Sequence, residues 1–166
     1  MERRDKINYY LDIAEAVTGR GTCLRRNFGA VIVKNDTIIS TGYVGAPRGR
    51  ANCNELHYCT REKLQVPRGE RYELCRSVHA EMNAIISAAR SECIGGTIYL
   101  AGRDVATGEL IPDLLPCPMC RRMIINAGLS KIVIRRTPST YDILNVQDWV
   151  FHDDSVIDPS ESGEQA

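Results

Sequence analysis

Residues 79–101, HAEMNAIISAARSECIGGTIYLA, change from a helical to a strand-like pattern, and this change decides the fold class. Over residues 79–91 the apolar side chains recur at helical spacing, which predicts a largely buried helix. Two glycines at positions 95 and 96 end that helix, and the apolar run over residues 97–101 predicts a strand. A helix that leads into a strand in this way is typical of an α/β protein.

The chain before this stretch predicts one helix and one β-hairpin. Residues 5–18 place five apolar side chains on one helical face, and two glycines stop the pattern. Residues 28–33 and 37–41 are short runs rich in β-branched residues, joined by turn-forming residues 34–36. The five apolar residues that we expect to face the core are Ile7, Tyr10, Leu11, Ala14 and Val17.

The chain after residue 101 predicts a further helix and further strands. Residues 116–127 begin with prolines, which fit the first turn of a helix, and a glycine at 128 ends it. Residues 131–135 predict a fourth strand and residues 145–149 a fifth, whereas residues 104–115 are expected to be an inserted loop. Helices that alternate with strands indicate an α/β layer structure, in which helices cover a mixed sheet of about five strands.

Length and charge set limits on the class of protein. The 166 residues are enough for one domain, which we expect over residues 1–152, followed by an acidic, disordered tail over residues 153–166. The N-terminal residues form no apolar signal segment and no run is long enough to span a membrane, so a cytosolic protein is expected. Lys plus Arg and Asp plus Glu both total 21, which disfavours a polynucleotide partner and a membrane surface.

Arginine outnumbers lysine 17 to 4, and several arginines are adjacent in the sequence. A guanidinium group fits a phosphate with two parallel hydrogen bonds, so one or two of these arginines could hold a small phosphorylated ligand. The alternative is that they are solvated or interface residues. The pairs are Arg25-Arg26, Arg121-Arg122 and Arg135-Arg136.

The residues that carry chemistry lie at the starts of two predicted helices, as His79-Ala80-Glu81 and as Pro116-Cys117-Pro118-Met119-Cys120. One imidazole nitrogen and two thiolates make three protein ligands for Zn²⁺, and three ligands leave a fourth position for water, as in catalytic zinc sites. The positive ends of the helix dipoles favour the thiolates. The sequence therefore predicts a catalytic zinc held by His79, Cys117 and Cys120.

Glu81 is the predicted catalytic residue. It follows His79 too closely in the chain to chelate the same ion comfortably, but it can reach a water in the fourth position. We expect it to move protons to and from that water. An inert or structural zinc is the alternative, and a site of that kind has no use for the carboxylate.

These motifs resemble the cytidine and deoxycytidylate deaminase superfamily, most closely its bacterial and phage dCMP deaminases. H-x-E followed by P-C-x-x-C is a known signature of zinc nucleobase deaminases. The resemblance covers residues 5–135 and implies a three-layer α/β/α cytidine-deaminase-like fold, homo-oligomers from dimer to hexamer, and zinc-dependent hydrolysis of dCMP to dUMP and ammonia, which supplies dUMP for thymidylate synthesis. Further segments that carry the resemblance are Thr22-Cys23, residues 28–33, residues 39–43, residues 45–49, Asn52-Cys53, residues 75–85 and residues 123–128.

Other functions stay open at the level of sequence. The same zinc site could deaminate another cytosine nucleotide, a nucleoside, a free base or a tRNA base. From a different class, the chain could be a non-catalytic zinc-binding partner of DNA-uptake machinery. In allosteric relatives dCTP activates and dTTP inhibits, and the resemblance gives Arg90, at the far end of the helix that begins at His79, as an effector-binding candidate.

The glycine-rich loop departs from the family pattern. Relatives usually carry Gly-Tyr-Asn-Gly, in which the Asn side chain hydrogen-bonds the nucleotide, whereas this chain has Gly-Tyr-Val-Gly over residues 42–45. Valine makes no such bond, so another group takes over the contact or the preferred substrate differs from dCMP. The alternative is a hydrophobic residue repacked at little cost. Val44, Arg48 and Asn83 are the candidate substrate-binding residues.

A second group of cysteines resembles a structural metal site. Some phage and bacterial dCMP deaminases hold a second zinc here, with ligands at positions that match Cys23 and Cys53. Cys59 and Cys75 would complete four thiolates and pin the irregular segment over residues 50–77. Buried free thiols are the alternative, and we expect Cys93 to be one.

Overall fold

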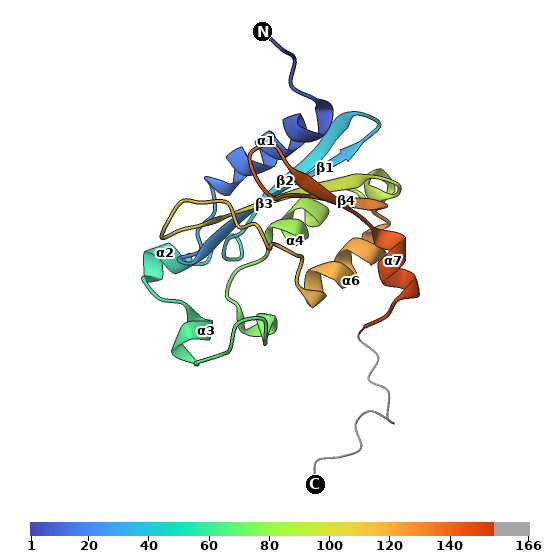
Figure 1. Cartoon of the computed structure of the whole chain (residues 1–166). Coiled ribbons are helices and arrows are strands. Elements are labelled where there is room, and N and C mark those ends of the chain that lie inside the picture. Colours follow the sequence, from blue (N-terminus) through green and yellow to red (C-terminus); the bar gives the residue numbers. More distant parts are fainter. Residues whose placement is uncertain (155–166) are drawn as a thin grey trace, which may run out of the picture.

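Three strands form the centre of the sheet because their side chains are apolar on both faces. The structure, a computed structural model, describes residues 1–154 and shows β1 (Arg26–Lys34), β3 (Thr97–Asp104) and β4 (Lys131–Arg135) side by side (Figure 1). Successive residues along each strand are buried, as expected for strands covered by helices on both sides. The strands predicted over residues 97–101 and 131–135 are confirmed.

Two outer strands complete a five-stranded mixed sheet in the order β2-β1-β3-β4-β5. β2 (Thr37–Tyr43) forms the predicted hairpin with β1, and β3 pairs antiparallel with β1 and parallel with β4. β5 (Tyr141–Asn145) pairs antiparallel with β4. The strand predicted over residues 145–149 is wrong, because Asn145 accepts a hydrogen bond from the Gln147 backbone nitrogen at 3.1 Å and so begins a helix, α7 (Val146–Phe151).

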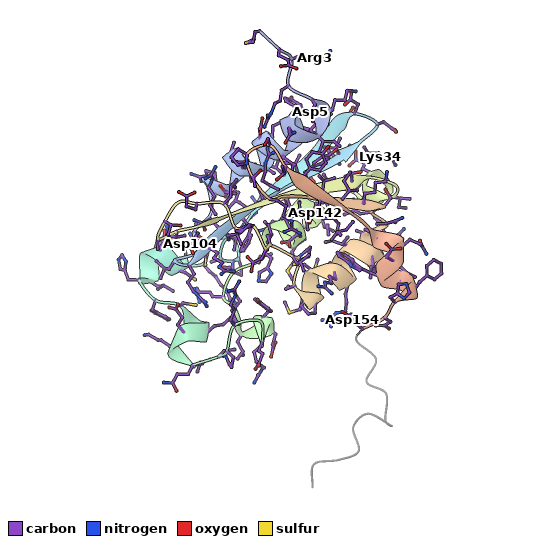
Figure 2. All side chains as sticks on the ribbon, viewed as in Figure 1. Arg3, Asp5, Lys34, Asp104, Asp142 and Asp154 are labelled. Atoms are coloured by element: carbon purple, nitrogen blue, oxygen red, sulfur yellow. The ribbon has the colours of Figure 1, made fainter. Side chains whose placement is uncertain are left out.

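Helix α1 (Lys6–Thr18) covers one face of the sheet, as the sequence predicts. Asp5 lies at its outer end (Figure 2), where its carboxylate accepts a hydrogen bond from the Asn8 backbone nitrogen at 3.0 Å and caps the helix. Leu11 and Ala14 are fully buried. They belong to a core cluster with Tyr10, Val31, Val33, Tyr99, Ala101 and Val133.

Helices α4 (Ala80–Ile86) and α6 (Pro118–Ala127) cover the opposite face, and α7 lies beside α6 (Figure 1). Ala84 and Ile124 pack there against sheet residues that include Ile32, Ile98 and Leu100. Helices on both faces of the sheet give the expected three-layer α/β/α fold. Gly128 ends α6 in the left-handed conformation, at φ 82°, which favours glycine.

The long buried helix predicted over residues 79–91 is wrong in its length and in its burial. α4 ends at Ile86, whose side chain is 68% exposed, and a separate short helix, α5 (Arg90–Cys93), follows after a break. The Glu92 carboxylate accepts a hydrogen bond from the Ala89 backbone nitrogen at 3.3 Å, which starts the new helix. Cys93 thereby reaches the core, where it is the buried free thiol that the sequence predicts.

Residues 44–79 lie outside the three layers, at the lower left of Figure 1. They contain the short helices α2 (Cys53–Leu56) and α3 (Thr60–Lys63) and the 3-10 turn η1 (Tyr72–Leu74). Gly45 and Val78 exchange backbone hydrogen bonds of 3.2 and 2.7 Å, which join the two ends of this segment. The segment, called the outer segment below, is therefore closed at its base, directly before α4.

The remaining predictions concern the inserted loop and the C-terminus. Residues 105–117 form the predicted loop between β3 and α6. No helix within residues 1–154 is both long enough and apolar enough to cross a membrane. The predicted tail lies, from residue 155 onward, outside the described residues, and Asp154 before it pairs with Arg121 of α6 at 3.1 Å (Figure 2).

Gly42 sets the distance between β2 and α4. A Cβ atom at this position would lie 2.3 Å from the Ala80 carbonyl oxygen and 2.3 Å from the Ala84 backbone nitrogen. Both atoms belong to the helix backbone and cannot rotate aside. A side chain at Gly42 would therefore push α4 away from the sheet.

We predict that Gly42→Ala lowers the free energy of unfolding by about 1–3 kcal/mol, the usual effect of overpacking. Chemical denaturation followed by circular dichroism measures this change. Gly45→Ala is the control, because the nearest atom to its added methyl group is 3.4 Å away, an ordinary contact. Equal denaturation midpoints for the two variants would argue against a tight contact between β2 and α4.

Candidate functional site

Two helices on one face of the sheet bring three metal-binding side chains together. His79 is the N-cap residue of α4, Cys117 is the N-cap residue of α6, and Cys120 lies in the first turn of α6. Pro118 fits that first turn because the backbone N–H it lacks has no partner there. The Cys117 sulfur accepts a hydrogen bond from the Cys120 backbone nitrogen at 3.5 Å, which fixes its direction.

The three side chains meet around one point. His79 Nδ1 lies 3.4 Å from Cys117 Sγ and 3.4 Å from Cys120 Sγ. These ligand atoms all lie within 4.8 Å of one another. Within residues 1–154, no other group of three or more His, Cys, Asp or Glu side chains is this close together. One nitrogen and two sulfurs are donors that suit Zn²⁺. The residues therefore fit the metal that the sequence predicts.

Glu81 lies in the first turn of α4, and only 6% of its surface is exposed. Burial raises the pKa of its carboxyl group above the usual range, because a charged carboxylate loses the stabilisation of water. The carboxyl group also forms a hydrogen bond with the Cys120 thiol. A buried acid of raised pKa beside three metal ligands is suited to proton transfer.

The metal-binding groups compete for protons. The hydrogen bond with Cys120 lowers the pKa of Cys117 to about 4, and the same interaction raises the pKa of Cys120. Burial alone would lower the pKa of His79, but hydrogen bonds with Cys117 and Cys75 raise it to about 10. A metal ligand must give up its proton, so a divalent cation and protons compete for the same three atoms.

Two side chains of the outer segment hold the His79 ring. Cys75 lies near enough to the ring for each group to shift the pKa of the other, and the Tyr72 ring packs edge-on against it with the ring centroids 5.8 Å apart. Groups around a metal-binding histidine fix its orientation and its protonation. The outer segment is therefore part of the site and not only a connection between β2 and α4.

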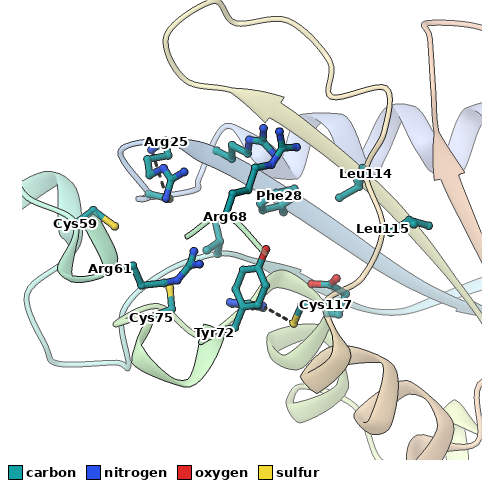
Figure 3. A pocket seen from close by; sticks show the side chains of 15 residues that line it. Arg25, Phe28, Cys59, Arg61, Arg68, Tyr72, Cys75, Leu114, Leu115 and Cys117 are labelled. Carbon is teal, nitrogen blue, oxygen red and sulfur yellow. Dashed lines mark hydrogen bonds between the residues drawn. The ribbon is translucent and has the colours of Figure 1, made fainter. Parts of the chain in front are cut away.

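A pocket opens over these residues (Figure 3). Glu81 and two of the candidate metal ligands, His79 and Cys117, line one end of it. An apolar wall adjoins this end, and Leu114 and Leu115 of the inserted loop extend it on one side (Figure 3). The apolar wall consists of Phe28, Val44, Leu114 and Leu115.

Four arginines line the pocket near the outer segment: Arg25, Arg26, Arg61 and Arg68. The sequence singles out the first two as an adjacent pair. It does not reveal Arg61 and Arg68, because the segment that carries them has no periodicity to show which residues face inward. Arginines that line a pocket are suited to bind a phosphate group.

The other arginine pairs that the sequence singles out have different partners. Arg135 is buried under α1, where its guanidinium group donates to Asn8 and Asp12. Arg136 pairs with Asp142 at 2.8 Å. Arg121 and Arg122 lie on α6 and do not line the pocket.

The four predicted substrate- and effector-binding residues lie in different places. Val44, 4% exposed, lines the pocket, whereas Arg48, Asn83 and Arg90 are not among its lining residues. The Asn83 amide donates to the Tyr43 carbonyl oxygen at 2.8 Å and so joins α4 to β2. Arg90 begins α5, not the end of the helix that follows His79, and donates to a backbone carbonyl of α6 at 3.0 Å.

The four cysteines predicted to bind a second zinc are electrostatic neighbours of one another. Burial raises the pKa of Cys53 most, and the charges of Cys23, Cys75 and Cys59 raise it further. The Cys53 sulfur also lies 3.9 Å from the Ser77 hydroxyl oxygen. Within the described part of the chain, these sulfurs do not form a group as close as the 4.8 Å cluster at His79.

Residues 4–136 match the family described as the cytidine and deoxycytidylate deaminase zinc-binding region. The deoxycytidylate deaminase of Mycobacterium phage D29 is 36% identical over 138 residues, which cover 80% of this chain and 96% of the phage protein. The deoxycytidylate deaminase of Schizosaccharomyces pombe is 32% identical over 126 residues, which cover 76% of this chain but only 35% of the yeast protein.

Two solved structures share the fold. The dCMP deaminase from the cyanophage S-TIM5, in complex with dCMP and dUMP, has a TM-score of 0.53 at 24% identity, covering 81% of this chain and 84% of that chain. The cytidine deaminase from Burkholderia pseudomallei has a TM-score of 0.55 at 18% identity, covering 84% of this chain and 92% of that chain. Both agree with the three-layer arrangement described above.

Proposed function

The chain belongs to the cytidine and deoxycytidylate deaminase family, and we propose that it hydrolyses dCMP to dUMP and ammonia, supplying dUMP for thymidylate synthesis. The observation that carries the proposal is the ligand set of His79, Cys117 and Cys120 beside the buried Glu81, in a pocket that arginines also line. The similarity to the deoxycytidylate deaminase of phage D29, almost all of whose length is matched, supports dCMP as the substrate.

Glu81 performs the proton transfers of this reaction. His79, Cys117 and Cys120 would hold Zn²⁺, which would act as a Lewis acid and lower the pKa of a water molecule. Glu81 takes a proton from the attacking water and gives it to N3 of the cytosine ring while the water oxygen bonds to C4. It then passes the second proton to the exocyclic amine, and the C4–N4 bond breaks to release ammonia and leave the C4 carbonyl of dUMP. A positioned acid and base of this kind contributes roughly 10²- to 10⁴-fold in rate.

The walls of the pocket support a nucleotide over a free base. With the ring at Glu81, the apolar wall adjoins the sugar and the arginines remain for a phosphate. A base or a nucleoside would bring no anion to Arg26 and Arg61, the two pocket arginines without an ion pair within residues 1–154. Val44 offers the nucleotide an apolar contact in place of the hydrogen bond usual in the family, so polar recognition depends on other pocket residues.

A spectrophotometric assay of cytosine, deoxycytidine, dCMP and dCTP tests the proposed function. We expect dCMP to have the highest kcat/KM, because it combines the reactive ring with a single phosphate. Faster turnover of cytosine or deoxycytidine would overturn dCMP as the substrate, and no loss of any of the four would overturn the deaminase activity. Addition of dCTP or dTTP to the dCMP assay tests the proposed effectors, which we expect to activate and to inhibit, respectively.

We predict that Glu81→Gln keeps zinc and binds dUMP but loses kcat by roughly 10²- to 10⁴-fold, because an amide cannot accept and return the proton. Elemental analysis measures the zinc, calorimetry measures dUMP binding, and the spectrophotometric assay measures kcat. Turnover close to that of the wild type would remove Glu81 from the mechanism. A parallel loss of zinc would mean that its role is structural.

A methionine-rich face supports the proposed homo-oligomer. Met82 of α4 and Met119 and Met123 of α6 line a shallow groove together with Ile125. Ile86, one turn further along α4, is 68% exposed. Exposed apolar surface of this kind is typical of association surfaces. We propose that copies of the chain associate through this face, which lies on the same two helices as the metal ligands.

A second, structural zinc is proposed at Cys23, Cys53, Cys59 and Cys75. The support is that these four thiols come from separate parts of the chain and influence one another around Cys53. A metal that drew their sulfurs together would tie the outer segment to Cys23, in the loop between α1 and β1. Structural zinc of this kind stabilises segments that a hydrophobic core cannot order.

We predict close to two zinc ions per chain, because each cysteine set forms its own site. Elemental analysis of Cys59→Ser is expected to show the loss of one equivalent, and Cys120→Ser the loss of the other. Cys93→Ser is the matched control, since this buried thiol belongs to neither set and should leave both equivalents in place. A single equivalent in the wild-type protein would contradict the structural site.

A further inference from the structure

Arg61 is a buried cation in the wall of the pocket. Only 7% of its surface is exposed, although it lies on a short helix of the outer segment. One terminal nitrogen of its guanidinium group donates to the backbone carbonyl oxygens of Pro67 and Glu70, at 3.1 and 2.6 Å. These bonds hold the guanidinium group in a fixed position without neutralising its charge.

The rest of the guanidinium group has no hydrogen-bond or ion-pair partner among the described residues. Arg61 Nε is buried and has no hydrogen-bond acceptor. None of the ion pairs between residues 1–154 involves Arg61. The charge of Arg61 contributes to the lowered pKa of Glu73, but the Glu73 carboxylate pairs with Arg71 at 2.5 Å. A buried charge without a counter-charge is unfavourable, so this position is suited to an anion that enters the pocket.

Two of the other three pocket arginines have a carboxylate partner. Arg25 pairs with Glu62 at 3.1 Å, and Arg68 pairs with Asp113 at 3.3 Å. The third, Arg26, has no ion pair within residues 1–154, but all three are more exposed than Arg61, so water stabilises their charges. Arg61 is therefore the pocket arginine with the most to gain from binding an anion.

The position of Arg61 relative to the metal ligands fits a nucleoside monophosphate. Its guanidinium carbon lies 4.4 Å from the centre of the Tyr72 ring, and the Tyr72 ring centre lies 5.8 Å from that of His79. Arg61 extends from α3 toward Tyr72 within the pocket (Figure 3). Two aromatic contacts thus connect the cation to the candidate metal ligand His79, so a phosphate at Arg61 and a ring at Glu81 lie in the same pocket.

We propose that Arg61 binds the 5′-phosphate of the substrate, with its second terminal nitrogen donating to a phosphate oxygen. Hydrogen bonds between an ionised guanidinium group and a phosphate are stronger than those between neutral groups. The inference rests on the proposed function, because it takes a cytosine nucleotide as the ligand. It adds the residue that makes the pocket select a phosphorylated substrate over the nucleoside.

Comparison of dCMP with deoxycytidine tests this role, because the two substrates differ only in the phosphate. In Arg61→Gln, kcat/KM for dCMP is expected to fall by roughly 10²-fold or more, as for other buried charge pairs that lose one partner. The value for deoxycytidine should stay within about twofold of the wild type. Arg61→Lys keeps the cation but loses the planar guanidinium group held by two carbonyl oxygens, so we expect its kcat/KM for dCMP to lie between those of Arg61→Gln and the wild type. Arg50→Gln is the matched control, since this exposed arginine of the outer segment does not line the pocket.

Binding measurements give a readout that does not depend on turnover. Calorimetry is expected to show weaker binding of dUMP to Arg61→Gln and unchanged binding of deoxyuridine. An equal loss for both ligands, or a lower zinc content per chain, would overturn the proposal and assign Arg61 to the architecture of the outer segment or its thiols. Failure of the wild-type protein to deaminate dCMP would instead overturn the proposed function, so the two failures are distinguishable.

Discussion

The meeting of two helix N-termini on one face of the sheet is the constraint on which the site depends. His79 and Cys117 are 38 residues apart in the chain, so no local contact sets their separation of 3.4 Å. The close approach of β2 at Gly42 positions α4, and the connection from β3 to the parallel strand β4 positions α6. The sheet therefore determines whether one nitrogen and two sulfurs can hold the same ion, and the motif residues supply only the donors.

The accuracy of the sequence predictions follows the range of the interactions involved. The first helix and the hairpin depend on periodicity within short segments, and both are confirmed. The predicted ligands His79, Cys117 and Cys120 also depend on short motifs, and the structure brings these three side chains together. The break after Ile86 was not predictable, because an exposed isoleucine counts as apolar in any helical pattern. The last strand was misplaced because β5 (Tyr141–Asn145) is an edge strand with several exposed side chains, whereas residues 146–151 are more apolar and form a helix.

The outer segment shows a second limit of prediction. Its residues are polar and lack periodicity, so Arg61 cannot be distinguished in the sequence from a solvated arginine. The structure buries it because the carbonyl oxygens of Pro67 and Glu70 accept its hydrogen bonds and the Tyr72 ring lies beneath it. Tyr72 and Cys75 of the same segment contact the His79 ring. The layered fold thus positions the candidate metal ligands, and a segment outside the layers adds the guanidinium, phenol and thiol groups beside them.

The distribution of charge explains how a chain with no formal net charge can select an anion. Arg25 and Arg68 are balanced by Glu62 and Asp113, so they add little to a long-range field. The unbalanced charge of Arg61 is buried, where an anion in direct contact feels it strongly and a distant anion does not. A polynucleotide is held by many exposed cations along its backbone. A single buried cation in the same pocket as Glu81 favours a small substrate with one phosphate. The proposed preference for dCMP therefore depends on the position of the Arg61 charge and not on the net charge of the chain.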